Sequence, residues 1–122
     1  MPNKTGSRCL LVAEIGNNHQ GDIRLAIRAI EEAARGGADL VKLQKRHMPS
    51  LFTGACMDVP YEGRNSFGKT YGEHRARLEL PVEALRELRA SAEACGIELF
   101  ASIWDRLRVL PWRISSRFAR AS

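Results

Sequence analysis

Near the start of the chain, apolar residues follow first the pattern of a strand and then that of a helix. Residues 10–15 form an apolar run rich in branched side chains, which Gly16 ends, and this pattern predicts a buried strand. From Ile23 onward apolar residues recur every three or four positions, which predicts an amphipathic helix. Asp22 is suited to be its N-cap, and residues 36–37 would end it because both are glycines.

The alternation of strand and helix continues along the chain. Residues 40–44 and 97–102 predict two further strands, and residues 81–95 predict a helix with Pro81 at its first position. The connection over residues 45–80 exceeds the ~15 residues that unstructured connections rarely pass. In α/β enzymes, such long connections at the carboxyl ends of strands build the site. The order of elements predicts parallel strands in an α/β protein.

The carboxyl end of each predicted strand carries polar side chains. They are Glu14 with residues 17–19, then Lys42 with Gln44, then Ser102 with Asp105. In a parallel barrel these ends converge on one rim, where a lysine can bind phosphate or carboxylate and a glutamate can act as a base or orient water. The alternative is that Glu14 and Lys42 form an ion pair whose only role is to satisfy two buried charges.

Other polar residues carry weaker indications. Asn17 and His19 follow the first strand and are candidates to line a site, whereas the three histidines lack the spacing of metal ligands, so no metal site is predicted in this chain. Tyr71 either lines the site or holds the long connection in place. Cys9 and Cys95 border apolar segments and are predicted to be small core residues.

The net charge of +5 arises entirely from residues 106–122, which hold five arginines and no acidic residue. This basic tail leaves open a binding module that contacts nucleic acid, but no nucleic-acid motif accompanies it, and we expect no nucleic-acid partner. The apolar runs are far shorter than the ~18 residues of a membrane span, so we expect no membrane partner. An odd number of cysteines and no signal-like leader predict a cytoplasmic protein.

Four motifs together resemble a known family. They are AEIGNNHQG at residues 13–21, GADLVKLQ at 37–44, TYGEHR with LEL within 70–80, and FASIWD at 100–105. In order and spacing they resemble the N-terminal part of the N-acetylneuraminate (sialic acid) synthases, with their legionaminate, pseudaminate and spore-coat polysaccharide relatives. The resemblance covers residues 9–105.

The resemblance implies a (β/α)8 barrel and a chemistry. Such enzymes condense phosphoenolpyruvate with an N-acetylated hexosamine such as N-acetylmannosamine, giving a nine-carbon 2-keto sugar acid and phosphate. A divalent metal, manganese or magnesium, polarises the open-chain sugar aldehyde, and the enzymes form homodimers.

The resemblance also assigns roles by motif. Glu14 matches a glutamate near the reacting carbons, proposed as a base or water-orienting group, and Lys42 matches the lysine that binds phosphoenolpyruvate. Gln44 matches the glutamine that contacts the amino sugar. Ser102 stands where the family usually has a threonine hydroxyl on the phosphate, although Ile103 replaces the common proline beside it.

A complete barrel needs ~250 residues, so we expect an α/β fold that is an N-terminal fragment of a TIM barrel, with about three parallel strands and two helices. The family's metal ligands would lie beyond residue 122, and the fragment alone is expected to be inactive. Residues 106–122 are unlike the family's next helix, because Pro111 interrupts them. A frameshift near residue 106 is one explanation, and a split synthase completed by a second chain is the alternative.

Overall fold

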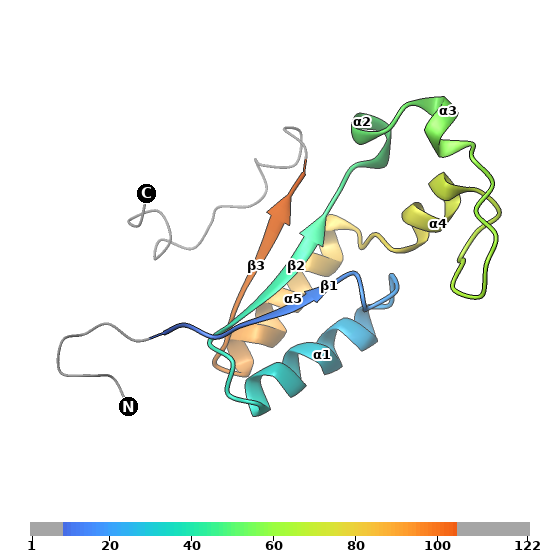
Figure 1. Ribbon diagram of the computed structural model, residues 1–122. Helices are drawn as coiled ribbons and strands as arrows, with labels where there is room; N and C mark the ends of the chain where they lie inside the picture. Colours follow the sequence, from blue (N-terminus) through green and yellow to red (C-terminus); the bar gives the residue numbers. More distant parts are fainter. Residues whose placement is uncertain (1–8, 105–122) are drawn as a thin grey trace.

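The computed structural model describes residues 9–104, so Asp105 and the basic tail lie outside the described residues. Its centre is a sheet of three parallel strands in the order β1-β2-β3 (Figure 1). The strands are β1 (Val12–Gly16), β2 (Leu40–Lys45) and β3 (Glu98–Ile103). The predicted parallel α/β architecture is confirmed.

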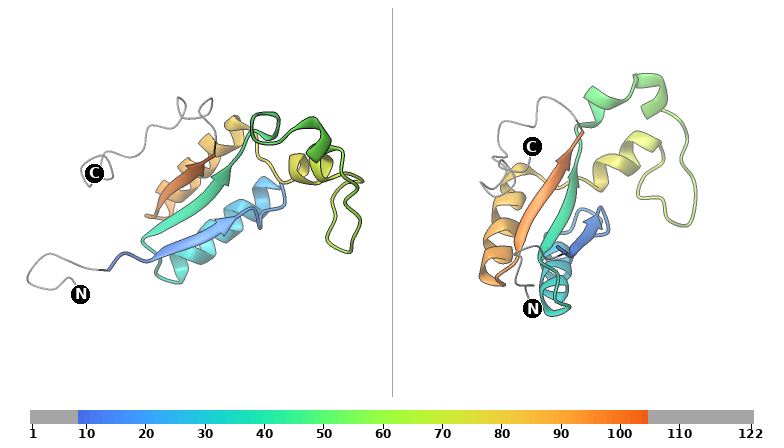
Figure 2. Two further views of the ribbon diagram at one scale, coloured as in Figure 1. Left: turned by 45° about the horizontal axis from the view of Figure 1, so that its top comes forward. Right: turned by 60° about the vertical axis from the view of Figure 1, so that its left-hand side comes forward.

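Two long helices, α1 (Ile23–Arg35) and α5 (Val82–Ala94), cover one face of the sheet (Figure 2). The core lies between them and the strands. Its largest fully buried side chains are Ile30, Leu43, Leu88 and Val41. Burying side chains of this size contributes about 1.5–3 kcal/mol each. Because side chains alternate along a strand, the neighbours of Val41 and Leu43 on β2 face the side that carries no described helix.

The first strand is shorter than predicted: β1 begins at Val12 and not at residue 10. The main-chain N–H of Leu11 donates to the Asp39 carboxylate at 2.9 Å, while the Leu11 carbonyl accepts from Asp39 and Leu40. A side chain therefore replaces the regular ladder here, and Leu10 and Leu11 are exposed.

The connection after β2 is not a plain loop. It folds into three short helices beyond the carboxyl ends of β1 and β2 (Figure 1): α2 (Met48–Leu51), α3 (Gly54–Met57) and α4 (Tyr71–Arg77). Thr53 and Thr70 cap α3 and α4, each accepting a hydrogen bond from a main-chain N–H three residues later. No helix in the described part is long and apolar enough to cross a membrane.

Two local predictions were wrong. Pro81 is the N-cap of α5 and not its first helical residue, because its ψ of 159° is extended. Cys9 and Cys95 are exposed and not in the core, since Cys9 precedes the sheet and Cys95 is the C-cap of α5. Bordering an apolar segment does not bury a residue where the element itself ends.

Candidate active site

Four predicted site residues lie on the face of the sheet opposite α1 and α5. Glu14 is paired in register with Lys42, and Gln44 is paired with Ser102. Residues paired across neighbouring parallel strands point to the same face, as do residues two apart on one strand. Side chains alternate along each strand, so Val41 and Leu43 are buried on the helix side. The four polar side chains therefore lie together on the other side.

Glu14 and Lys42 form an ion pair, with Oε2 and Nζ 2.9 Å apart. Their side chains are 45% and 32% exposed within the described residues, and the ion pair that both alternatives allow is present. Exposed ion pairs contribute only about 0–1 kcal/mol to stability. The pair therefore contributes little to the stability of the fold. Within the described residues it is accessible to a ligand.

A bulge at the end of β1 brings Gln44 to the same place. The register shifts between Glu14 and Gly16, and Gly16 has a φ of +58°. A Cβ added to Gly16 would lie 3.5 Å from Glu14 Oε1 and 3.8 Å from Gln44 Nε2. Glu14, Lys42 and Gln44 therefore flank one short stretch of backbone.

Asn17, in the turn after β1, is partly buried, and its Oδ1 is a buried acceptor without a hydrogen-bond partner. A buried polar atom without a partner costs about 1–3 kcal/mol. Its predicted place in the lining of a site is consistent with this unused acceptor and stays a prediction.

His19 belongs to a separate, buried cluster. It is 2% exposed, and its Nδ1 accepts a hydrogen bond from the main-chain N–H of Gly21 at 3.0 Å. Burial lowers its pKa from the ordinary 6.5; Glu79 raises that pKa and Lys45 lowers it. These contacts hold the turn after β1. They do not place His19 with the ion pair on the face of the sheet opposite α1 and α5, which we call the open face.

Lys45 was missed by the sequence analysis. Its Nζ donates to Glu79 Oε2 at 2.8 Å and to the Leu80 carbonyl at 2.9 Å. Lys45 is two residues after Leu43 and four after Val41 on β2, so its side chain points to the same, buried side. A lysine at a core-facing position, where charged residues are rarely buried without a partner, is the signal that could have found it.

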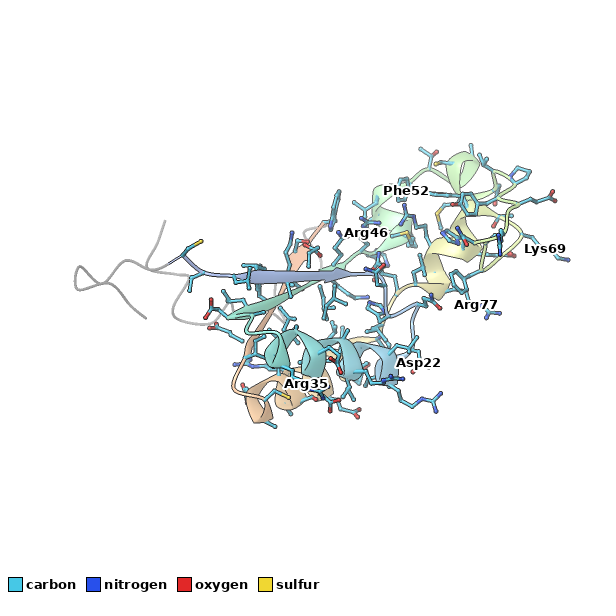
Figure 3. The ribbon with its side chains drawn as sticks, turned by 60° about the horizontal axis from the view of Figure 1, so that its bottom comes forward. Asp22, Arg35, Arg46, Phe52, Lys69 and Arg77 are labelled. Atoms are coloured by element: carbon cyan, nitrogen blue, oxygen red, sulfur yellow. The ribbon has the colours of Figure 1, made fainter. Side chains whose placement is uncertain are left out.

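Arg46 was also missed. Its Nη2 donates to Gln44 Oε1 at 2.7 Å, and its guanidinium lies 4.5 Å from the centre of the Trp104 ring. Arg46 is on the side of the sheet away from α1 (Figure 3). No sequence motif singled out Arg46.

Tyr71 is in the long connection, at the start of α4. Its ring packs edge-on against Phe52 and Tyr61, with centroids 5.5 and 5.8 Å away, and its hydroxyl accepts from Arg75 Nε at 3.0 Å. These contacts hold the connection together, which was one of the two alternatives. A role for Tyr71 in lining the site stays a prediction.

His74 has a similar position in the connection. It is buried, and its Nδ1 accepts from the Phe67 main-chain N–H at 3.2 Å. Burial lowers its pKa from 6.5, and Arg75 lowers it further.

The described residues do not fit a divalent metal. No group of three or more His, Cys, Asp or Glu side chains within residues 9–104 could hold a metal ion.

A model of the NeuB family matches residues 29–112. This chain belongs to the NeuB family. It is 44% identical over 101 residues to human N-acetylneuraminate-9-phosphate synthase, covering 83% of this chain and 28% of that protein. It is 32% identical over 99 residues to N,N'-diacetyllegionaminic acid synthase of Campylobacter jejuni, covering 80% of this chain and 30% of that protein.

Solved structures show the same arrangement of strands and helices. A sialic acid synthetase from Leptospira borgpetersenii matches with a TM-score of 0.63 at 24% identity, over 86% of this NeuB-family chain and 32% of that chain. A spore coat polysaccharide biosynthesis protein E from Chromobacterium violaceum matches with a TM-score of 0.58 at 25% identity, over 85% and 30%. The predicted family and fold class are confirmed, and the chain spans about a third or less of these relatives.

Proposed function

We propose that this chain provides the part of a sialic acid synthase-type site formed by its three strands, where phosphoenolpyruvate and an N-acetylated hexosamine such as N-acetylmannosamine bind. In the condensation, the methylene carbon of phosphoenolpyruvate forms a bond to the sugar aldehyde carbon. Water adds at the carbon that bears the phosphate, and inorganic phosphate leaves. The observation that carries the proposal is the gathering of Glu14, Lys42 and Gln44 on the open face of the sheet.

Lys42 is the residue that would bind the anionic groups of phosphoenolpyruvate. Its ammonium is the cation of the ion pair on the open face, and a phosphate or carboxylate of phosphoenolpyruvate would share it with Glu14, 2.9 Å away. The Glu14 carboxylate would then remain beside the bound molecule, where it can orient the attacking water or accept its proton.

Ser102 and Gln44 complete the polar row. The two residues are paired in register across β2 and β3, two residues further along β2 than Lys42 of the ion pair. The Ser102 hydroxyl would donate to the phosphate, and the Gln44 amide would bind the amino sugar. This division puts the anion and the sugar on neighbouring positions of one face.

The whole reaction is proposed for the complete synthase and not for this chain alone. The chain spans 28% of the human relative, and residues 9–104 do not fit the divalent metal that the family resemblance implies. We expect no turnover by the chain alone; the cytoplasmic location and the homodimer implied by the resemblance are part of the same proposal.

Binding of phosphoenolpyruvate to the chain tests the proposal directly. Lys42→Met is expected to weaken binding about tenfold or more, since a hydrogen bond to a charged group is worth about 1.5–3 kcal/mol. Arg28→Met, which removes an equal charge from the exposed face of α1, is the matched control and should bind like the unaltered chain. Equal affinity in the two variants would contradict the role of Lys42.

Phosphate release from phosphoenolpyruvate, with N-acetylmannosamine and manganese, tests the state of the chain. We expect none from the chain alone. Phosphate release that appears only when a second chain is added would support the split synthase. Phosphate release by the chain alone, abolished in Lys42→Met, would overturn the expectation of inactivity.

A further inference from the structure

Arg46 lies where β2 and β3 end, directly beside the open face. Its guanidinium stacks on the Trp104 ring at 4.5 Å, and the Trp104 main-chain N–H donates to the Lys45 carbonyl at 3.2 Å. The aromatic ring that supports Arg46 is therefore itself tied to β2. A cation over an aromatic face is held by about 0.5–1 kcal/mol at exposed sites.

The main chain of Arg46 is held from the other side of the sheet. Its N–H donates to Glu79 Oε2 at 3.2 Å, and the same oxygen accepts from Lys45 Nζ at 2.8 Å. The end of β2 is thus fixed on the buried side by Glu79, while the Arg46 side chain lies on the open side against Trp104 and Gln44.

The side chain of Arg46 determines which way the Gln44 amide faces. A guanidinium has only donors, so the Gln44 oxygen must be the atom that accepts from Nη2 at 2.7 Å. Gln44 Nε2 is then turned away from Arg46, and it lies 3.8 Å from the place of a Cβ on Gly16, next to Glu14. The amide therefore presents its NH2 donors, and not its oxygen, on the side of Gly16 and Glu14.

We propose that Arg46 is a positioning residue that fixes the Gln44 amide with its NH2 group toward the substrate. The proposal rests on the proposed function and deepens it, because it assigns the substrate group. A fixed donor binds an acceptor, such as the carbonyl oxygen of an N-acetyl group. It does not accept a hydrogen bond from the ammonium of a free amino sugar, which has only donors. Arg46 thereby acts on the choice between acetylated and free amino sugars.

A spectroscopic signature tests the positioning without any ligand. In the full chain, nuclear Overhauser contacts are expected between the Gln44 side-chain NH2 and the Gly16 Hα protons. Arg46→Met keeps an apolar stem over Trp104 but removes the donors, so these contacts should be lost as the amide reorients. Arg46→Lys keeps a donor and should restore them. Contacts that persist unchanged in Arg46→Met, or that are absent from the unaltered chain, would overturn the positioning role.

Sugar titrations followed by chemical shift test the consequence. The unaltered chain should bind N-acetylmannosamine more tightly than mannosamine, and Arg46→Met should weaken the former about three- to tenfold, as expected for an unfixed side chain. Arg46→Lys should retain most of the affinity, and Arg28→Met on α1 should retain all of it.

Gln44→Glu supplies a variant that does not depend on removing Arg46. Its carboxylate would still pair with Arg46 but has no donor, so binding of N-acetylmannosamine should fall about tenfold or more. Undiminished binding in Gln44→Glu would overturn the donor assignment. Failure of the unaltered chain to bind either sugar would overturn the sugar site itself, whereas the ligand-free contacts decide the positioning by Arg46 separately.

Discussion

Lys45 and Glu79 form an ion pair with Nζ and Oε2 2.8 Å apart, although 34 residues separate them in the chain. Their side chains are only 8% and 13% exposed. The pair joins the end of β2 to the segment that leads into α5, and so closes the long connection at its base. It lies on the buried side of β2, whereas Lys42 and Gln44 lie on the open side.

The two lysines of β2 should therefore differ in their effect on stability. Lys45→Met removes the cation from the buried Glu79 carboxylate, which keeps only the hydrogen bond from the Arg46 main-chain N–H among those described above. The variant is expected to lower the free energy of unfolding by about 3–5 kcal/mol. Lys42→Met breaks the exposed pair and should cost about 1 kcal/mol or less. Urea unfolding with trimethylamine N-oxide, which strengthens a marginal fold, measures both. Equal losses would contradict the difference in burial.

Gly21 should tolerate no side chain. It has a φ of +76°, and a Cβ there would lie 2.1 Å from the Arg77 carbonyl oxygen, where the turn before α1 meets the end of α4 (Figure 3). Gly21→Ala is expected to cost the left-handed strain of about 1–2 kcal/mol and a further 1–3 kcal/mol for the overlap.

Gly37→Ala is the matched control, because Gly37 has a φ of +86° and no atom within 4 Å of an added Cβ. It should cost only the left-handed strain. The same unfolding measurement compares the two, and a loss in Gly21→Ala no larger than in Gly37→Ala would show that the two backbones do not meet.

Stability should fall as the pH decreases below about 6.5. Burial lowers the pKa values of His19 and His74 in the folded chain. Below about pH 6.5, the ordinary pKa of histidine, the unfolded chain therefore binds protons at these two residues that the folded chain does not bind. Their contribution is therefore complete above 6.5 and is lost as the pH falls through the lowered folded-state values. Protonation would also break the hydrogen bonds that each Nδ1 accepts from a main-chain N–H.

The measurement is the free energy of unfolding between pH 7.5 and 5.5, a range in which ordinary carboxylates stay charged. In His19→Asn and His74→Asn an amide oxygen can replace Nδ1 as the acceptor without titrating. Each variant should reduce the pH dependence, and a dependence unchanged in both would contradict the assignment.

The sequence by itself determined the alternation of strands and helices, the family and the residues that share the open face. These follow from local periods: a strand alternates its side chains, so Lys42 and Gln44 had to share a face once Val41 and Leu43 were buried. Parallel strands then brought Glu14 and Ser102 beside them. The register that pairs Glu14 with Lys42 and Gln44 with Ser102 joins distant parts of the chain and comes from the tertiary structure.

Only the tertiary structure decided what holds these residues in place. The pairing of Lys45 with Glu79, the effect of these two charges on His19, and the support that Trp104 gives to Arg46 all involve residues far apart in the chain. A local pattern has no signal for such contacts. The three short helices of the connection were missed because segments of four to seven residues are too short to show a helical period. Such short helices depend on caps and on packing. The exposure of Cys95 likewise depends on where α5 ends and on which neighbours cover that end.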